Sequence, residues 1–105
     1  MTEWIKVGQV GDPAAGQVKV IMTRGERIAL ANLNGDYYAI DDLCTHDGGS
    51  LDQGEVIGDQ IECPRHGARF DLKTGKAMTL PAIFPVKTYV VKVEGSDILI
   101  ELEEG

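Results

Sequence analysis

The sequence predicts an all-β domain, and three observations support this. The 105 residues suffice for one domain but are too few for a cofactor domain plus a separate substrate domain. Short apolar segments alternate with turn-forming residues, whereas no window of about ten residues carries a helical stripe. The chain contains no internal repeat, linker or low-complexity tract. We therefore expect residues 1–105 to form a single antiparallel β-sandwich or barrel.

Turn-forming residues divide the chain into short candidate strands. Asn34-Gly35 supplies two residues that tolerate positive φ in a tight hairpin turn, and 73–76 and 94–97 have the composition of further turns. Two prolines within 79–85 would interrupt a hydrogen-bonding ladder, so we expect a loop there. The expected strands are 5–7, 17–22, 27–33, 37–40, 60–62, 69–72, 86–93 and 97–102.

The last of these segments has the clearest strand pattern. Ile98, Ile100 and Leu102 would share one face, and the other face would carry Asp97, Leu99, Glu101 and Glu103. An apolar face and a largely acidic face predict a strand with one side on the core.

The balance of charge limits the classes of partner. Ten Lys and Arg against seventeen Asp and Glu give a net charge of -7 and a pI near 4.6. Such a surface repels phosphate backbones and anionic membranes, which argues against nucleic acid and lipid as partners. A protein with a positive face is the natural complement. The alternative is that the charge serves only solubility.

The sequence also indicates a compartment. No segment approaches the eighteen or so apolar residues of a membrane span, and the N-terminus lacks the basic and apolar regions of a signal peptide. We therefore expect a cytoplasmic protein. Its two cysteines would then be reduced and available to a metal.

Every Cys and every His of the chain lies in one of two short boxes. The first box, 43–49, contains Cys44 and His46, and after sixteen intervening residues the second box, 62–68, contains Cys63 and His66. Two loops brought together by a sheet would present two sulfurs and two nitrogens to one centre, the ligand set of zinc or of an iron–sulfur cluster. Zinc fingers usually pair like ligands in each knuckle, whereas mixed boxes suit two irons. A structural zinc module remains the less favoured alternative.

Cys44-Thr45-His46 and Cys63-Pro64-Arg65-His66-Gly67 resemble the two boxes of the Rieske [2Fe–2S] proteins. The likeness is strongest to the small soluble ferredoxins of bacterial ring-hydroxylating dioxygenase systems. The resemblance implies one cluster, with Cys44 and Cys63 on one iron and His46 and His66 on the other. It also implies a Rieske-like antiparallel β-sandwich or barrel with a cluster-binding subdomain at one tip.

Several positions depart from the high-potential members of this family. Gly49 and Arg65 stand where those members carry cysteines joined as a disulfide between the loops. Ala68 and Phe70 stand where they carry Ser and Tyr hydroxyls near the cluster. The proline-containing loop that covers the cluster in the family has its nearest match at 80–82.

These departures bear on the reduction potential. Two ferric ions, two sulfides and two thiolates sum formally to zero, so an added electron makes a monoanion. His ligation thereby raises the potential from about −400 mV to between about −150 and +300 mV. Ala68 and Phe70 offer no hydroxyl to the sulfurs, and the acidic Asp41, Asp42 and Asp47 would oppose the added electron. We expect the low end of the range, about −150 mV.

The same residues argue against an enzyme. Both His are expected ligands, so none is left as a general base, and no strand is followed by a Gly-rich dinucleotide fingerprint. We expect a monomeric one-electron carrier between a ferredoxin reductase and the terminal oxygenase of an aromatic-ring-hydroxylating dioxygenase system. The alternative is a small subunit of another oxidoreductase, such as assimilatory nitrite reductase.

Overall fold

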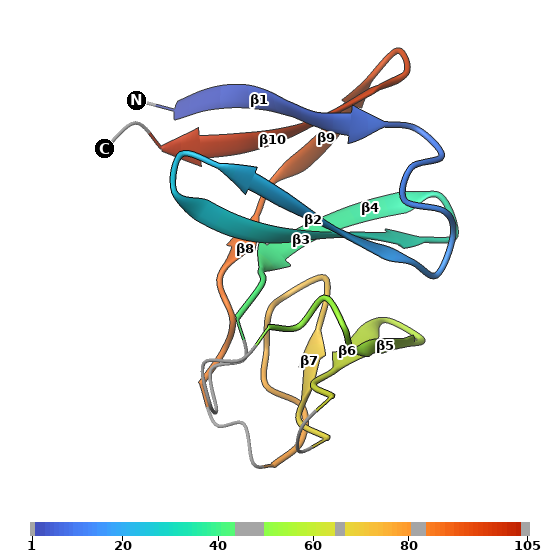
Figure 1. Cartoon of the computed structure of the whole chain (residues 1–105), viewed down its shortest axis with the longest axis vertical. Coiled ribbons are helices and arrows are strands. Elements are labelled where there is room, and N and C mark those ends of the chain that lie inside the picture. Colours follow the sequence, from blue (N-terminus) through green and yellow to red (C-terminus); the bar gives the residue numbers. More distant parts are fainter. Residues whose placement is uncertain (1, 44–49, 65–66, 81–83, 104–105) are drawn as a thin grey trace.

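The architecture consists of three stacked antiparallel sheets (Figure 1). The computed structural model describes residues 2–43, 50–64, 67–80 and 84–103, and within these ranges every regular element is a β-strand. The prediction of an all-β fold is confirmed. In the same ranges, no helix is long and apolar enough to cross a membrane.

The sheets are named here by their position in Figure 1. The upper sheet has the order β1-β10-β9, the central sheet β2-β3-β4-β8 and the lower sheet β5-β6-β7. The strands are β1 (Thr2–Gln9), β2 (Val18–Thr23), β3 (Glu26–Leu33), β4 (Asp36–Asp41), β5 (Glu55–Ile57), β6 (Gln60–Glu62), β7 (Arg69–Asp71), β8 (Thr88–Tyr89), β9 (Val91–Glu94) and β10 (Asp97–Glu103).

Strand β3 is buried on both of its faces. Successive strand residues point to opposite sides of a sheet. Ile28 and Leu30 pack into the core shared with the upper sheet, whereas Ala29 and Ala31 pack into the core shared with the lower sheet. All four side chains are fully buried. The central sheet therefore forms the middle layer between two hydrophobic cores.

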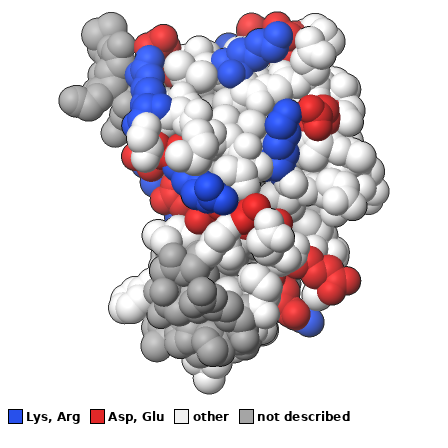
Figure 2. Space-filling model, viewed as in Figure 1, with Lys and Arg blue, Asp and Glu red and all other residues white. Residues whose placement is uncertain are grey.

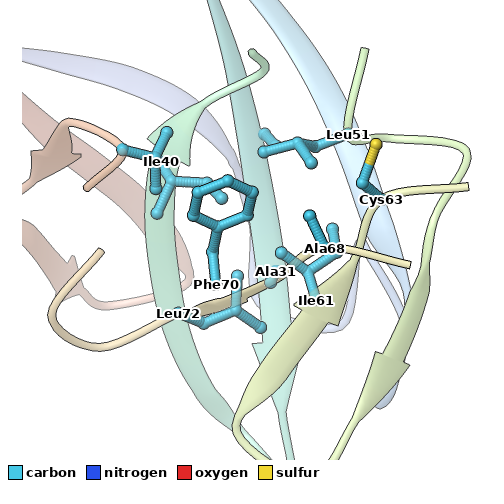
Figure 3. Packing of buried hydrophobic residues seen from close by; sticks show 10 residues of the cluster. Ala31, Ile40, Leu51, Ile61, Cys63, Ala68, Phe70 and Leu72 are labelled. Atoms are coloured by element: carbon cyan, nitrogen blue, oxygen red, sulfur yellow. The ribbon is translucent and has the colours of Figure 1, made fainter. Parts of the chain in front are cut away.

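The core between the central and lower sheets, here called the lower core, is built around Phe70. Figure 3 shows the Phe70 ring from β7 between Ile40 of the central sheet and the other apolar side chains of this layer. Burial of an aromatic side chain of this size is worth several kcal/mol of stability. Its buried members are Ala29, Ala31, Ile40, Leu51, Ile61, Cys63, Ala68, Phe70, Leu72 and Val86.

The strand predictions hold for seven of the eight segments, with shifts at their ends. The eighth, 86–93, was expected to be one strand and is divided at Val90. Its first part, β8, pairs with β4 in the central sheet, and its second part, β9, pairs with β10 in the upper sheet. The chain changes sheets here, and Val90 is exposed at the crossing point.

One strand, β5, was not predicted. It has three residues and lies between Gly54 and Gly58, so it is too short for a recognisable alternation. Gly54 is required at its entry, because a Cβ there would lie 2.0 Å from the carbonyl oxygen of Glu62 on the neighbouring strand. Sheet pairing, rather than local sequence preference, defines this strand.

Two glycines with positive φ allow a matched test of how the turn after β7 packs against the chain around Val86. Gly75 (φ 77°) accepts a hydrogen bond from the Val86 amide at 2.8 Å, and a Cβ at Gly75 would lie 2.1 Å from the Val86 carbonyl oxygen. Gly58 (φ 59°), in the β5–β6 turn, has nothing within 4 Å of the same position.

We expect Gly58→Ala to lower the free energy of unfolding by about 1–2 kcal/mol, the cost of a left-handed backbone. Gly75→Ala should lose about 1–3 kcal/mol more, because its Cβ meets backbone that cannot move freely. Urea denaturation measures both. Equal losses would contradict the close approach of Gly75 to Val86.

Candidate functional site

The second box lies at the hairpin between β6 and β7. The Cys63 amide donates to the Ala68 carbonyl at 2.6 Å, and the Gly67 amide donates to the Cys63 carbonyl at 3.1 Å. Gly67 has φ 73°, a left-handed conformation that glycine adopts without Cβ strain. Backbone hydrogen bonds thus fix Cys63 where the lower sheet ends.

The Cys63 side chain is 1% exposed and belongs to the lower core. Figure 3 shows its sulfur beside Leu51, near Ala68. Its thiol is free of any disulfide among the described residues. A buried thiol held at a tight turn beside an apolar layer fits a structural metal ligand shielded from water.

The other three predicted ligands lie outside the described residues. They are Cys44, His46 and His66. Cys63 is therefore the one predicted ligand whose surroundings the structure gives. Its neighbours Ala68 and Phe70 are fully buried, and neither side chain carries a hydroxyl.

Asp42, directly before the first box, is a buried anchor rather than a free surface charge. Its Oδ1 accepts from the Leu51 amide at 2.8 Å and the Asp52 amide at 2.7 Å. Its Oδ2 accepts from Ser50 Oγ at 2.9 Å and Arg27 Nε at 2.5 Å. The hydrogen bond to Asp42 raises the pKa of the Arg27 guanidinium.

This arrangement revises the expectation that Asp41 and Asp42 oppose an incoming electron as bare charges. Arg27 partly offsets the charge of Asp42, because its guanidinium also lies 3.6 Å from the Asp52 carboxylate. Asp41 accepts a hydrogen bond from the Tyr89 hydroxyl. Burial and the neighbouring Asp41 raise the pKa of Tyr89, so the phenol stays protonated. The third acidic residue of that expectation, Asp47, lies outside the described residues.

Thr79 joins the start of the predicted third loop to the second box. Its hydroxyl donates to the Gly67 carbonyl at 3.3 Å and accepts from the Arg69 amide at 2.9 Å. The Met78 amide donates to the Arg69 carbonyl at 2.8 Å. Neither the role of Thr79 nor the anchoring contacts of Asp42 could be predicted from the sequence, because each side chain binds residues about ten positions away along the chain.

Exposed apolar side chains occur in the segments next to the boxes and the third loop. Leu80 is 81% exposed and Phe84 is 68% exposed, and Leu43 and Met78 are each more than two-fifths exposed. Exposed large apolar side chains are typical of surfaces that meet other proteins.

Comparison with known proteins identifies relatives along most of the chain. The family described as the Rieske [2Fe–2S] domain matches residues 3–90. The ferredoxin component of biphenyl 2,3-dioxygenase from Rhodococcus jostii (strain RHA1) is 40% identical over 100 residues, 95% of this chain and 94% of that protein. The ferredoxin subunit of 3-phenylpropionate/cinnamic acid dioxygenase from Shigella boydii serotype 4 (strain Sb227) is 54% identical over 79 residues, 74% of each chain.

Solved structures agree with this likeness. The ferredoxin of carbazole 1,9a-dioxygenase from Nocardioides aromaticivorans IC177 superposes with a TM-score of 0.89 at 32% identity, covering 92% of this chain and 95% of that one. A chain in the complex of reduced oxygenase and oxidized ferredoxin of carbazole 1,9a-dioxygenase gives 0.88 at 32% identity, with coverages of 92% and 91%. A protein described as a nitrite reductase NADPH small subunit gives 0.81 at 21% identity, with coverages of 93% and 97%, a likeness of fold alone.

The hydroxyl of Thr79 can be tested by Thr79→Val, which keeps the shape and removes both hydrogen bonds. We expect the free energy of unfolding to fall by about 1 kcal/mol and the Arg69 amide to exchange faster with solvent. Thr79→Ser should restore most of the stability and of the slow exchange at Arg69. Thr23→Val, at the half-buried end of β2, should leave the exchange at Arg69 unchanged. Unchanged exchange at Arg69 in Thr79→Val would show that the hydroxyl does not hold the second box.

Proposed function

The chain belongs to the Rieske [2Fe–2S] domain family, and we propose that it works as a soluble one-electron carrier. It would accept electrons from a reductase and deliver them to the terminal oxygenase of an aromatic-ring-hydroxylating dioxygenase system. The observation that carries this proposal is the extent of the likeness: 95% of the chain matches 94% of a relative that is itself named a ferredoxin component. Such components transfer electrons and do not themselves transform the substrate, so we assign no catalytic residue.

The predicted ligand set remains part of the proposal. Cys44 and Cys63 would hold one iron through sulfur, and His46 and His66 the other through ring nitrogen. When bound, the cluster supplies a site that takes up and releases one electron. The residues around Cys63 support this assignment, because the hairpin fixes the thiol and the lower core keeps water from it.

The environment of Cys63 also supports a potential at the low end of the Rieske range. Hydrogen bonds to cluster sulfurs stabilise the reduced state and raise the potential. Ala68 and Phe70 cannot donate such bonds from their side chains. The offset of Asp42 by Arg27 weakens the acidic contribution to this expectation, so the missing hydroxyls become its main basis.

The partners follow from the relatives. The carbazole 1,9a-dioxygenase ferredoxin has been solved in complex with its oxygenase, which supports an oxygenase as the electron acceptor of this chain. The apolar residues next to the boxes provide a surface for such an encounter. We further propose a reductase as the donor, a cytoplasmic location, and a monomer whose 105 residues form one Rieske domain.

Metal analysis and EPR test the ligand set. The purified protein should contain iron and acid-labile sulfide in a 1:1 ratio, and dithionite reduction should produce an EPR signal with a low average g value. Cys63→Ser should abolish or strongly reduce cluster content. Ser96→Ala, in the turn before β10, should leave the cluster intact. Zinc without iron in the wild-type protein would instead support the structural zinc module.

The net charge of -7 predicts the salt dependence of electron transfer. Raising ionic strength from about 0.01 to 1 M shortens the Debye length from about 30 to 3 Å, which removes long-range attraction to a basic partner. We expect the second-order rate constant with the reductase or oxygenase to fall by about tenfold or more. Stopped-flow absorbance of the cluster measures this rate. A rate constant independent of salt would contradict electrostatic attraction to a partner and would support the alternative that the charge serves only solubility.

A further inference from the structure

The buried carboxylate of Asp42 receives four hydrogen bonds from two separate parts of the chain. Arg27 donates from β3, and Leu51 and Asp52 donate backbone amides. The Ser50 hydroxyl shares its one proton between Asp42 and the Asp52 carboxylate. The side chain is fully buried. A carboxylate removed from water is costly unless its oxygens are satisfied, and here each oxygen accepts twice.

These contacts fix the two ends of the first box. Residues 43–49, which contain Cys44 and His46, start directly after Asp42 and end directly before Ser50. The Asp42 amide also donates to the Arg27 carbonyl at 2.9 Å, so both its backbone and its side chain are tied to the central sheet. One side chain thereby holds the entry and the exit of this seven-residue segment against the same strand.

The exit is in turn connected to the second box through Leu51. The amide of Leu51 binds Asp42, while its fully buried side chain packs in the lower core with Cys63 (Figure 3). The position of Asp42 thus sets where Leu51, two residues after the first box, lies in the core that contains the buried thiol of Cys63. Positions 49 and 65 hold Gly and Arg, so no disulfide joins the boxes there, and contacts such as those of Asp42 would act together with the shared cluster in setting this relation.

The Asp42–Arg27 pair differs from the other ion pairs of the described residues. On the face drawn in Figure 2, Lys and Arg side chains lie beside Asp and Glu side chains at the surface. Lys19–Asp12 and Lys6–Asp97, for example, have both partners at least two-fifths exposed, whereas the Asp42 side chain is fully buried. Exposed pairs contribute little. A buried, fully bonded carboxylate defines geometry.

We propose that Asp42 is a positioning residue for the metal centre, holding the first box in register with Cys63 through Arg27, Ser50, Leu51 and Asp52. This inference rests on the proposed function, in which the first box supplies Cys44 and His46 as ligands. Asp42 touches neither substrate nor metal in this assignment, and acts through the backbone that it holds.

The cluster-loaded protein tests this with Asp42→Asn, which keeps the shape but removes the charge and replaces one of the two acceptor oxygens with an NH2 group that cannot accept. We expect cluster loss to a chelator, followed by visible absorbance, to accelerate about tenfold, the factor that corresponds to about 1.4 kcal/mol. The EPR g values of the reduced protein should shift or broaden. Asp36→Asn, at the other end of β4, removes the same charge and should change neither.

If Asp42→Asn folds poorly, variants that remove a single partner of Asp42 can test the proposal instead. Ser50→Ala removes one of the four hydrogen bonds and should accelerate cluster loss by a smaller factor. Arg27→Gln should accelerate it clearly, whereas Lys19→Gln, on the adjacent strand, should not. Wild-type cluster loss and EPR in both Ser50→Ala and Arg27→Gln would overturn the proposal. The proposal would also be overturned if the rate of cluster loss simply tracked the urea unfolding midpoint of each variant, and if the controls Asp36→Asn and Lys19→Gln lost the cluster equally fast.

Amide hydrogen exchange separates this proposal from the proposed function. In Ser50→Ala and Asp42→Asn, the Leu51 and Asp52 amides should exchange at least about tenfold faster, whatever metal the chain carries. Wild-type protein that contains zinc and no iron would refute the electron carrier and leave this readout valid. If these variants bind iron but their Leu51 and Asp52 amides exchange at the wild-type rate, the positioning role of Asp42 is refuted, while the proposed electron-carrier function is unaffected.

Discussion

The burial of β3 on both faces is the constraint on which the molecule depends. Its larger residues, Ile28 and Leu30, pack toward the upper sheet, and its alanines pack toward the lower one. The lower sheet consists of three strands of three residues each and could not be stable alone. It gains its stability from the central sheet, through Phe70 and Ile40. The hairpin that carries Cys63 is therefore placed by a sheet that supplies none of the predicted ligands.

The two boxes and most of the strands could be predicted from the sequence, because each is marked by residues close together in the chain. The spacing of Cys and His identified both boxes, and alternation identified β10, whose Ile98 and Ile100 are fully buried. Strand β5 and the division at Val90 could not be predicted, because pairing with a distant strand decides them. The anchoring contacts of Asp42 were hidden for the same reason. Its partners lie on both sides in sequence, and an Asp before a Cys box gives no sign of them.

The local charge near the boxes differs from what the composition suggests. The chain as a whole is acidic, yet the carboxylate nearest the first box in sequence among the described residues is matched by Arg27. A similar balance holds at the second box, where Arg69 Nε lies 3.0 Å from Glu62 Oε2 across the β6–β7 pair. Long-range attraction to a partner and the field at the metal centre are thus set by different residues. A substitution on the acidic surface can therefore change the attraction to a partner without changing the field at the metal centre.

The layered arrangement has a consequence for how such a protein can diversify. Among the described residues, the core under the upper sheet and the lower core lie on opposite faces of the central sheet, and alternation gives each face its own set of side chains. Substitutions that repack Ile28 or Leu30 against the upper sheet leave the alanine face unchanged. Substitutions can therefore repack the upper sheet while the packing around Phe70 and Cys63 is kept. The central sheet thus insulates the hairpin that carries Cys63 from changes made on its other side.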